Sequence, residues 1–119
     1  MAGHFMLKEP QKGVRDVIER FLNQKRPLKS KWAFQTYYDP FKGSYLVLTH
    51  YHHTLLVINP KTKLIAFQWW EKPTDLRGLQ SAVLVLKEYQ LIKEEYQWDN
   101  TIKRFVLIPN SATHQMALN

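Results

Sequence analysis

The sequence predicts a single α+β domain over residues 1–119, with two helices on one face of a mainly antiparallel β-meander of four to five strands. The expected element order is α-β-β-β-β-α-β. The stretch from Ser44 to Trp70 is rich in β-branched and aromatic residues and is broken by the turn signal Asn59-Pro60. One apolar stripe of helical period precedes this stretch and another follows it. With 119 residues, 45% of them hydrophobic, the chain is large enough to bury a real core.

The first helix is predicted over residues 11–24, and Pro27 closes it because proline disfavours helix at the preceding residue. Its buried stripe consists of Val14, Val17, Ile18, Phe21 and Leu22. Residues 25–31 form a basic linker, and residues 32–38 form a strand. Alternation places Tyr37 on the face of that strand opposite to Trp32 and Phe34.

The meander itself is predicted as strands 44–49, 54–58 and 63–70. Between the first two, residues 50–53 either turn the chain or carry one long strand through a bend. The absence of glycine there disfavours the tightest hairpins. In the last strand we expect Ile65, Phe67 and Trp69 to face the core.

The second helix begins at Thr74 or Asp75, either of which can serve as N-cap, and runs to about Tyr96. Gly78 lowers helix propensity near its start by up to about 1 kcal/mol relative to alanine. A turn at residues 98–100 leads to a final strand at 102–108. Residues 1–10 and 109–119 are expected to fray.

Composition excludes several classes of protein. There is no cysteine, so neither a disulfide framework nor thiolate chemistry is available. No apolar run approaches the roughly 18 residues that a membrane span needs. The N-terminal residues lack the regions of a secretory signal. We therefore expect a cytoplasmic protein without a membrane partner or a cofactor.

The net charge of +7 is concentrated at the N-terminus. Residues 1–31 hold eight Lys or Arg against three acidic residues. A one-sided positive surface attracts nucleic acid or an acidic protein face. The expected contacts are Lys12, Arg15, Arg20, Lys25, Arg26, Lys29 and Lys31, with Tyr37 stacking on exposed bases.

Three histidines, His50, His52 and His53, form the most conspicuous cluster of possible metal ligands. On a strand, His50 and His52 share a face and His53 points the other way. A catalytic zinc site needs a third ligand, yet no acidic residue lies between Phe41 and Trp70. A polar turn with an incidental histidine run is therefore favoured over a metal site.

Catalytic motifs are absent. The chain contains neither HExxH, nor the P-loop glycine pattern, nor GxSxG. Its ten acidic residues are scattered, whereas two-metal nuclease chemistry needs clustered carboxylates. We therefore expect a protein that is not an enzyme.

Tryptophans 69 and 70 are adjacent in a strand and must point to opposite faces. Only one can enter the core of a one-sided sheet. Coverage of the other by the protein's own second helix is favoured, because tryptophan is highly buried on average. An exposed Trp70 would instead serve as an anchor for a protein partner.

A local pattern resembles small uncharacterised proteins of bacteriophages and mobile elements, over about a third of the chain. It comprises Tyr51 and 54–56, a hairpin, Trp69-Trp70, Thr74, and a helix ending at 86–89. The chain departs from it at Asp75, at 77–78 and at Gln90. The resemblance implies a phage-type accessory origin, hence a host cytoplasm, and no catalytic role.

These observations favour a non-enzymatic module that engages nucleic acid, or a host nucleoprotein complex, through the basic N-terminal region. The alternative is an inhibitor of a host defence complex such as a CRISPR nuclease, acting by protein–protein contact at Trp69 or Trp70. A metal-dependent enzyme using the histidine cluster comes third. An uncovered edge strand would also allow a homodimer.

Overall fold

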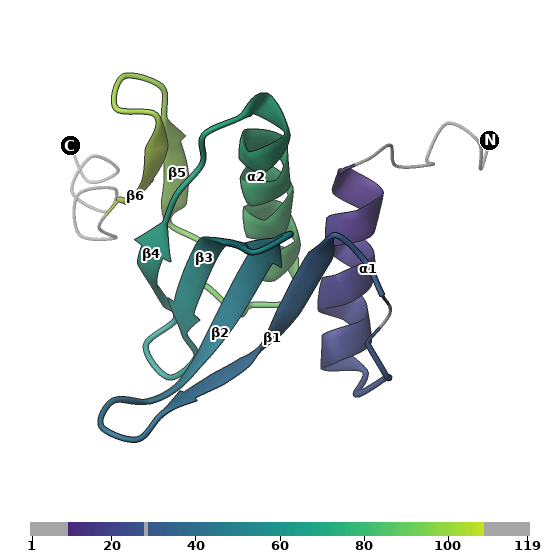
Figure 1. Cartoon of the computed structure of the whole chain (residues 1–119). Coiled ribbons are helices and arrows are strands. Elements are labelled where there is room, and N and C mark those ends of the chain that lie inside the picture. Colours follow the sequence, from purple (N-terminus) through teal and green to yellow (C-terminus); the bar gives the residue numbers. More distant parts are fainter. Residues whose placement is uncertain (1–9, 28, 109–119) are drawn as a thin grey trace.

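The structure is a computed structural model that describes residues 10–27 and 29–108, so the ends expected to fray lie almost wholly outside the described part. Within it the elements, in chain order, are α1 (Gln11–Leu22), β1 (Trp32–Asp39), β2 (Gly43–His50), β3 (His53–Asn59), β4 (Leu64–Gln68), α2 (Pro73–Glu88), β5 (Tyr96–Asp99) and β6 (Arg104–Leu107) (Figure 1). The predicted α+β class is confirmed. No helix of the described ranges has the length and apolarity of a membrane span.

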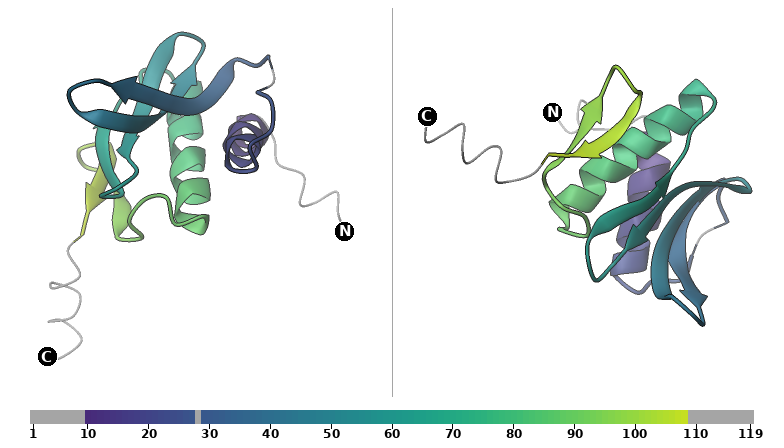
Figure 2. Two further views of the ribbon diagram at one scale, coloured as in Figure 1. Left: turned by 90° about the horizontal axis from the view of Figure 1, so that it is seen from below. Right: turned by 90° about the vertical axis from the view of Figure 1, so that its left-hand side faces the viewer.

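Strands β1 to β4 form an antiparallel sheet in the order β1-β2-β3-β4, and β5 pairs with β6 in a separate hairpin. Both helices lie on the same face of the four-stranded sheet, with α1 beside β1 (Figures 1 and 2). The opposite face carries no described element and is called the open face below. This one-sided covering explains why buried residues alternate with more exposed ones along β2 and at the start of β1.

Helix α1 buries its predicted stripe, with Val14 and Ile18 fully enclosed. The ring of Phe21 meets the ring of Phe34 on β1 edge-on, at 5.1 Å between centroids. This packing fixes α1 against β1.

Gly78 is a requirement of packing as well as a cost to the helix. The indole of Trp32 lies so close to it that a Cβ added at Gly78 would collide with the ring. The indole is also stacked on His50, at 4.0 Å between ring centroids and 14° between planes. Trp32 is 1% exposed, so strand β1 and helix α2 meet through this ring.

The predicted end of the second helix was wrong, because α2 stops at Glu88 and not near Tyr96. Gln90 takes a left-handed φ of 58°. Its N–H donates to the carbonyl of Lys87, and the N–H of Leu91 donates to the carbonyl of Leu86. These two bonds close a Schellman motif, which usually uses glycine. A glutamine in this position gives no sequence signal.

The final segment is a hairpin, whereas a turn at 98–100 and a single strand were predicted. Trp98 belongs to β5, and the turn comes after Asp99. The hairpin lies against β4, where the side chain of Gln68 both donates to the carbonyl of Phe105 (2.9 Å) and accepts from its N–H (2.8 Å). The side-chain amide of Gln68 thus pairs with Phe105 as the backbone of a neighbouring strand would. This pairing covers the β4 edge of the sheet.

Two further corrections concern the meander. The chain turns through only Tyr51 and His52, although a hairpin that tight was disfavoured; Tyr51 adopts the left-handed φ of 56° that glycine usually supplies. In β4 the register shifts, so that Val57 opposes Phe67 while the next residue, Ile58, opposes Ile65. The extra residue turns Phe67, 45% exposed, onto the open face, so its predicted core position was wrong.

Candidate nucleic-acid interface

The structure divides the predicted cationic residues into two groups. Arg15 is bound within the fold, with its guanidinium donating to Glu88 at 2.8 and 3.0 Å and to Glu19 at 3.2 Å. The hydrogen bond to Glu88 raises the pKa of Arg15 and lowers that of the glutamate. Arg20 donates to the carbonyl oxygen of Arg26 at 2.8 and 3.0 Å. Arg15 thus links α1 to α2, and Arg20 links α1 to the loop that follows it.

The remaining predicted cations lie at the surface. Lys12 is exposed on α1. The residues between α1 and β1, called the basic connector below, expose Lys25, Arg26, Lys29 and Lys31. The basic connector meets the sheet at the start of β1, where the carbonyl of Lys31 accepts a hydrogen bond from the N–H of Tyr51.

The open face presents two tyrosines side by side. Tyr37 on β1 and Tyr45 on β2 are direct cross-strand partners, so their side chains share one face. Tyr37 is 59% exposed, as expected for a residue on the face opposite to the buried Trp32 and Phe34. The same strand also exposes Tyr38, but on the other face, opposite Ser44.

The rest of this surface is formed by the next cross-strand row. Val47 opposes Gln35 on one side and Val57 on the other, and Val57 opposes Phe67. We call the set Tyr37, Tyr45, Val47, Val57 and Phe67 the open-face platform. Its members come from all four strands, and none is charged.

A shallow hollow of about 410 Å³ lies on this platform, lined by Tyr37, Asp39, Lys42, Tyr45, Val47, Thr54, Val57 and Ala66. Lys42 supplies a cation at its rim. The Asp39 carboxylate is engaged locally, because one of its oxygens accepts from the N–H groups of Phe41 and Lys42 at 2.7 and 3.1 Å. The hollow therefore combines aromatic walls with a free ammonium group.

The electrostatics of the platform favour anions. No carboxylate occurs in the sequence between Asp39 and Glu71. Lys42 lies in the β1–β2 turn and Lys61 and Lys63 in the β3–β4 turn, and these turns lie at the same end of the antiparallel sheet. This is also the end at which the tyrosine pair is located.

The three histidines are not brought together. His50 is buried on the covered face, His52 is exposed in the hairpin turn, and His53 is exposed beside Trp69, at 5.5 Å between rings. Residues 10–27 and 29–108 contain no group of three or more side chains that could hold a metal ion. A metal site at the histidine cluster thus gains no support from the geometry.

His50 has a structural partner that the sequence did not reveal. Its Nδ1 lies 2.7 Å from the carboxylate of Asp75, which also accepts the N–H of Lys72 at the start of α2. Burial raises the pKa of Asp75, but the hydrogen bonds from His50 and from backbone N–H groups outweigh it and leave that pKa below its usual value. The ionised carboxylate fastens the first turn of α2 to the end of β2.

Trp70 and Trp69 are both half-buried against the core. The indole N–H of Trp70 donates to the carbonyl of Lys103 at 3.0 Å. The β5–β6 hairpin and its turn therefore cover Trp70, whereas the sequence predicted that the second helix would cover it. Trp98 packs edge-on against Phe105 within that hairpin, at 5.1 Å between rings.

Sequence reasoning identified Tyr37 and missed the remainder of the platform. The available signal was the alternation in β2, where the pairs Tyr45–Val47 and Leu46–Leu48 define opposite faces. Both pairs are apolar, so the pattern alone did not say which one the helices cover. Comparison of the chain with family models, with curated proteins and with solved structures gave no match, so its function is inferred from its own geometry.

Proposed function

We propose that the protein is a non-catalytic module that binds single-stranded nucleic acid on its open-face platform. The observation that carries the proposal is the Tyr37–Tyr45 pair, which lines an open hollow whose lining carboxylate, Asp39, accepts hydrogen bonds from two backbone N–H groups. Exposed aromatic rings on a sheet stack unpaired bases, each contributing about 1–3 kcal/mol. In a duplex the base faces are already stacked on one another, which favours the single strand.

In this proposal charge and stacking have separate sources. Lys42, Lys61 and Lys63 lie at the end of the sheet that holds the tyrosines, where they contact phosphates. The basic connector attracts the strand at longer range and belongs to the net positive field of the molecule. This differs from the sequence-based hypothesis, in which the N-terminal cations themselves formed the interface.

The competing hypothesis, inhibition of a host defence complex by contact at Trp70, has less support. The indole N–H of Trp70 is already bonded to Lys103 and its ring is half-buried, so it offers a partner little free surface. An origin in a phage or mobile element, and with it a cytoplasmic location, remains part of the proposal and rests on the resemblance alone.

The proposal is tested by fluorescence anisotropy with labelled single-stranded and duplex oligonucleotides, of DNA and of RNA. We expect micromolar or tighter binding of the single strand, weaker binding of the duplex, and a loss of affinity of about tenfold or more between about 50 and 200 mM salt. The triple variant Lys42→Gln, Lys61→Gln, Lys63→Gln should flatten this salt dependence.

Neutralising Lys25, Arg26, Lys29 and Lys31 to glutamine is the matched control, since it removes a similar charge elsewhere on the surface. It should weaken binding less than the triple variant does. If the control variant loses more affinity, the interface lies at the connector and not on the platform. If wild-type protein binds no oligonucleotide at the lower salt, the proposal is wrong.

A further inference from the structure

The two edges of the four-stranded sheet are treated differently. The edge at β4 is covered by the β5–β6 hairpin, through the two hydrogen bonds between Gln68 and Phe105. The edge at β1 pairs only with β2 within the described ranges. Along such an edge, alternate backbone N–H and C=O groups point away from the sheet and are free to pair with another strand.

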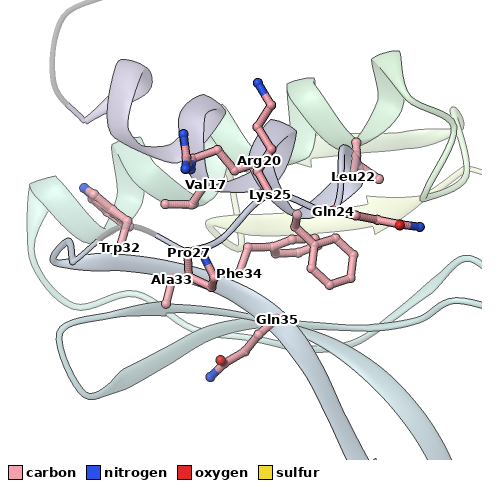
Figure 3. A pocket seen from close by; sticks show the side chains of 11 residues that line it. Val17, Arg20, Leu22, Gln24, Lys25, Pro27, Trp32, Ala33, Phe34 and Gln35 are labelled. Atoms are coloured by element: carbon pink, nitrogen blue, oxygen red, sulfur yellow. The ribbon is translucent and has the colours of Figure 1, made fainter.

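A groove of about 500 Å³ runs between this edge and α1. Side chains of both elements converge on it in Figure 3, with Val17 and Leu22 from the helix and Phe34 from the strand. Ala33 and Gln35, which point to the other face of β1, line it as well. Because residues of both faces contribute, the groove follows the free edge of the strand.

The groove is apolar inside and cationic at its rim. Beside the aliphatic and aromatic side chains, its lining includes Arg20 and Lys25, and no carboxylate is among the described residues that form it. Lys25 and Pro27 of the basic connector belong to this lining, and the other cations of the connector, Arg26, Lys29 and Lys31, are exposed. From Gln24 to Tyr38 the sequence contains no acidic residue at all.

We propose that this groove binds an extended acidic peptide segment of a protein partner, which adds to the sheet as a strand beside β1. Backbone groups of the segment pair with the free edge. Alternate apolar side chains enter the groove between Val17 and Phe34, and acidic side chains meet the exposed Lys25. An extended peptide held between a helix and a sheet edge is an established mode of recognition. Four strand residues line the groove, which corresponds to a segment of about 13 Å.

The charge selects the partner. An acidic segment complements the rim, whereas a basic or neutral one does not. Nucleic acid is favoured less at this place, because it has no backbone amides to pair with a strand edge and no aliphatic side chains for the groove. This site is separate from the open-face platform, and the inference does not depend on the proposed function.

The test begins with selection of peptides from a displayed random 12-residue library, with the full chain as bait. We expect enriched sequences that alternate apolar and Asp or Glu residues. The most enriched peptide, added to labelled protein, should shift the backbone amide resonances of Ala33 and Gln35 and slow their hydrogen exchange. Lys25→Glu should weaken its binding about tenfold or more, because it replaces an attraction by a repulsion.

Two variants serve as controls. Lys12→Glu makes the same charge change on α1, outside the groove, and should weaken peptide binding far less than Lys25→Glu does. Tyr37→Ala should leave peptide binding unchanged while it weakens oligonucleotides, so that failure of one proposal is distinguished from failure of the other.

The inference is overturned if no acidic extended sequence is enriched over a bait-free selection, or if the selected peptide shifts resonances elsewhere and not those of Ala33 and Gln35. A concentration-dependent dimer that shifts the same resonances would assign the groove to a second copy of the chain. An oligonucleotide that shifts them in place of the peptide would assign it to nucleic acid. Each of these results contradicts the proposal that an acidic peptide binds in the groove.

Discussion

On the covered face of the sheet, Leu48 and Ile58 are fully buried under the helices, whereas their neighbours Val47 and Val57 on the open face keep part of their surface in water. All four are branched aliphatic residues in central strands. Burial of apolar surface stabilises the fold in proportion to the area removed from water. The open face is therefore apolar to a degree that stability of the chain alone does not require.

The two faces therefore have different roles. The covered face holds Trp32, His50 and Gly78 in fixed contacts, and a change there alters folding. The open face presents Tyr37 and Tyr45, which little of the fold constrains. A substitution there should alter binding. Matched substitutions on the two faces test this division.

The largest effect is expected from adjacent residues of β2. Leu48→Ala should lower the free energy of unfolding by about 2–5 kcal/mol, because it leaves a cavity in the core. Val47→Ala should lower it by about 1 kcal/mol or less, since only strand propensity and partial burial are lost. Urea denaturation at constant m-value measures both. Equal losses would mean that the open face is buried in solution and would contradict the division.

A somewhat smaller loss is expected at Gly78. Alanine there gains up to about 1 kcal/mol of helix propensity, yet its methyl group collides with Trp32, so we expect a net loss of about 1–3 kcal/mol. The double variant with Trp32→Phe should lose less than the sum of its parts, because the smaller ring leaves room. Leu84→Ala, at an exposed position of the same helix, should change stability by about 0.5 kcal/mol or less.

The third effect depends on pH. The pKa of Asp75 is lowered in the folded protein, so its stabilising contribution is fully present above its unfolded pKa of about 4 and is lost as pH falls through the folded value. Asp75→Asn should therefore cost about 1–3 kcal/mol at neutral pH. The difference in stability between this variant and the wild type should become smaller below pH ~4. Thermal unfolding from neutral to acidic pH measures this difference, with Asp16→Asn at an exposed position as control. A difference that stays constant would contradict an ionised Asp75 carboxylate.

Much of the fold was predictable because its causes are local. The helical stripe of α1, the turn at Asn59-Pro60 and the alternation of β1 are each written in consecutive residues, and the structure confirms the elements that they predict. The errors arose where a residue adopts a backbone conformation that its type disfavours. Tyr51 and Gln90 both have positive φ, so the tight hairpin and the end of α2 carried no glycine signal.

The candidate site was less predictable because it depends on contacts that are distant in sequence. From the sequence Arg15 is a free surface cation, but in the structure it is hydrogen-bonded to Glu88. The alternation in the sequence predicts that Phe67 faces the core, but the bulge in β4 turns it outward. Tyr45 becomes conspicuous only once its strand neighbour is known to be Tyr37.

The smallest effect on stability should accompany a large effect on nucleic-acid binding. Tyr37→Ala and Tyr38→Ala remove exposed tyrosines from adjacent positions of β1, one from the open face and one from the other. Both should change stability by about 0.5 kcal/mol or less. The measurement is the affinity of each variant for one labelled single-stranded oligonucleotide at low salt.

We predict that Tyr37→Ala weakens binding by about 5- to 100-fold, the loss of one stacked base, while Tyr38→Ala changes it by less than about twofold. Equal losses in the two variants, or no loss in either, would contradict the assignment of the open face as the nucleic-acid interface.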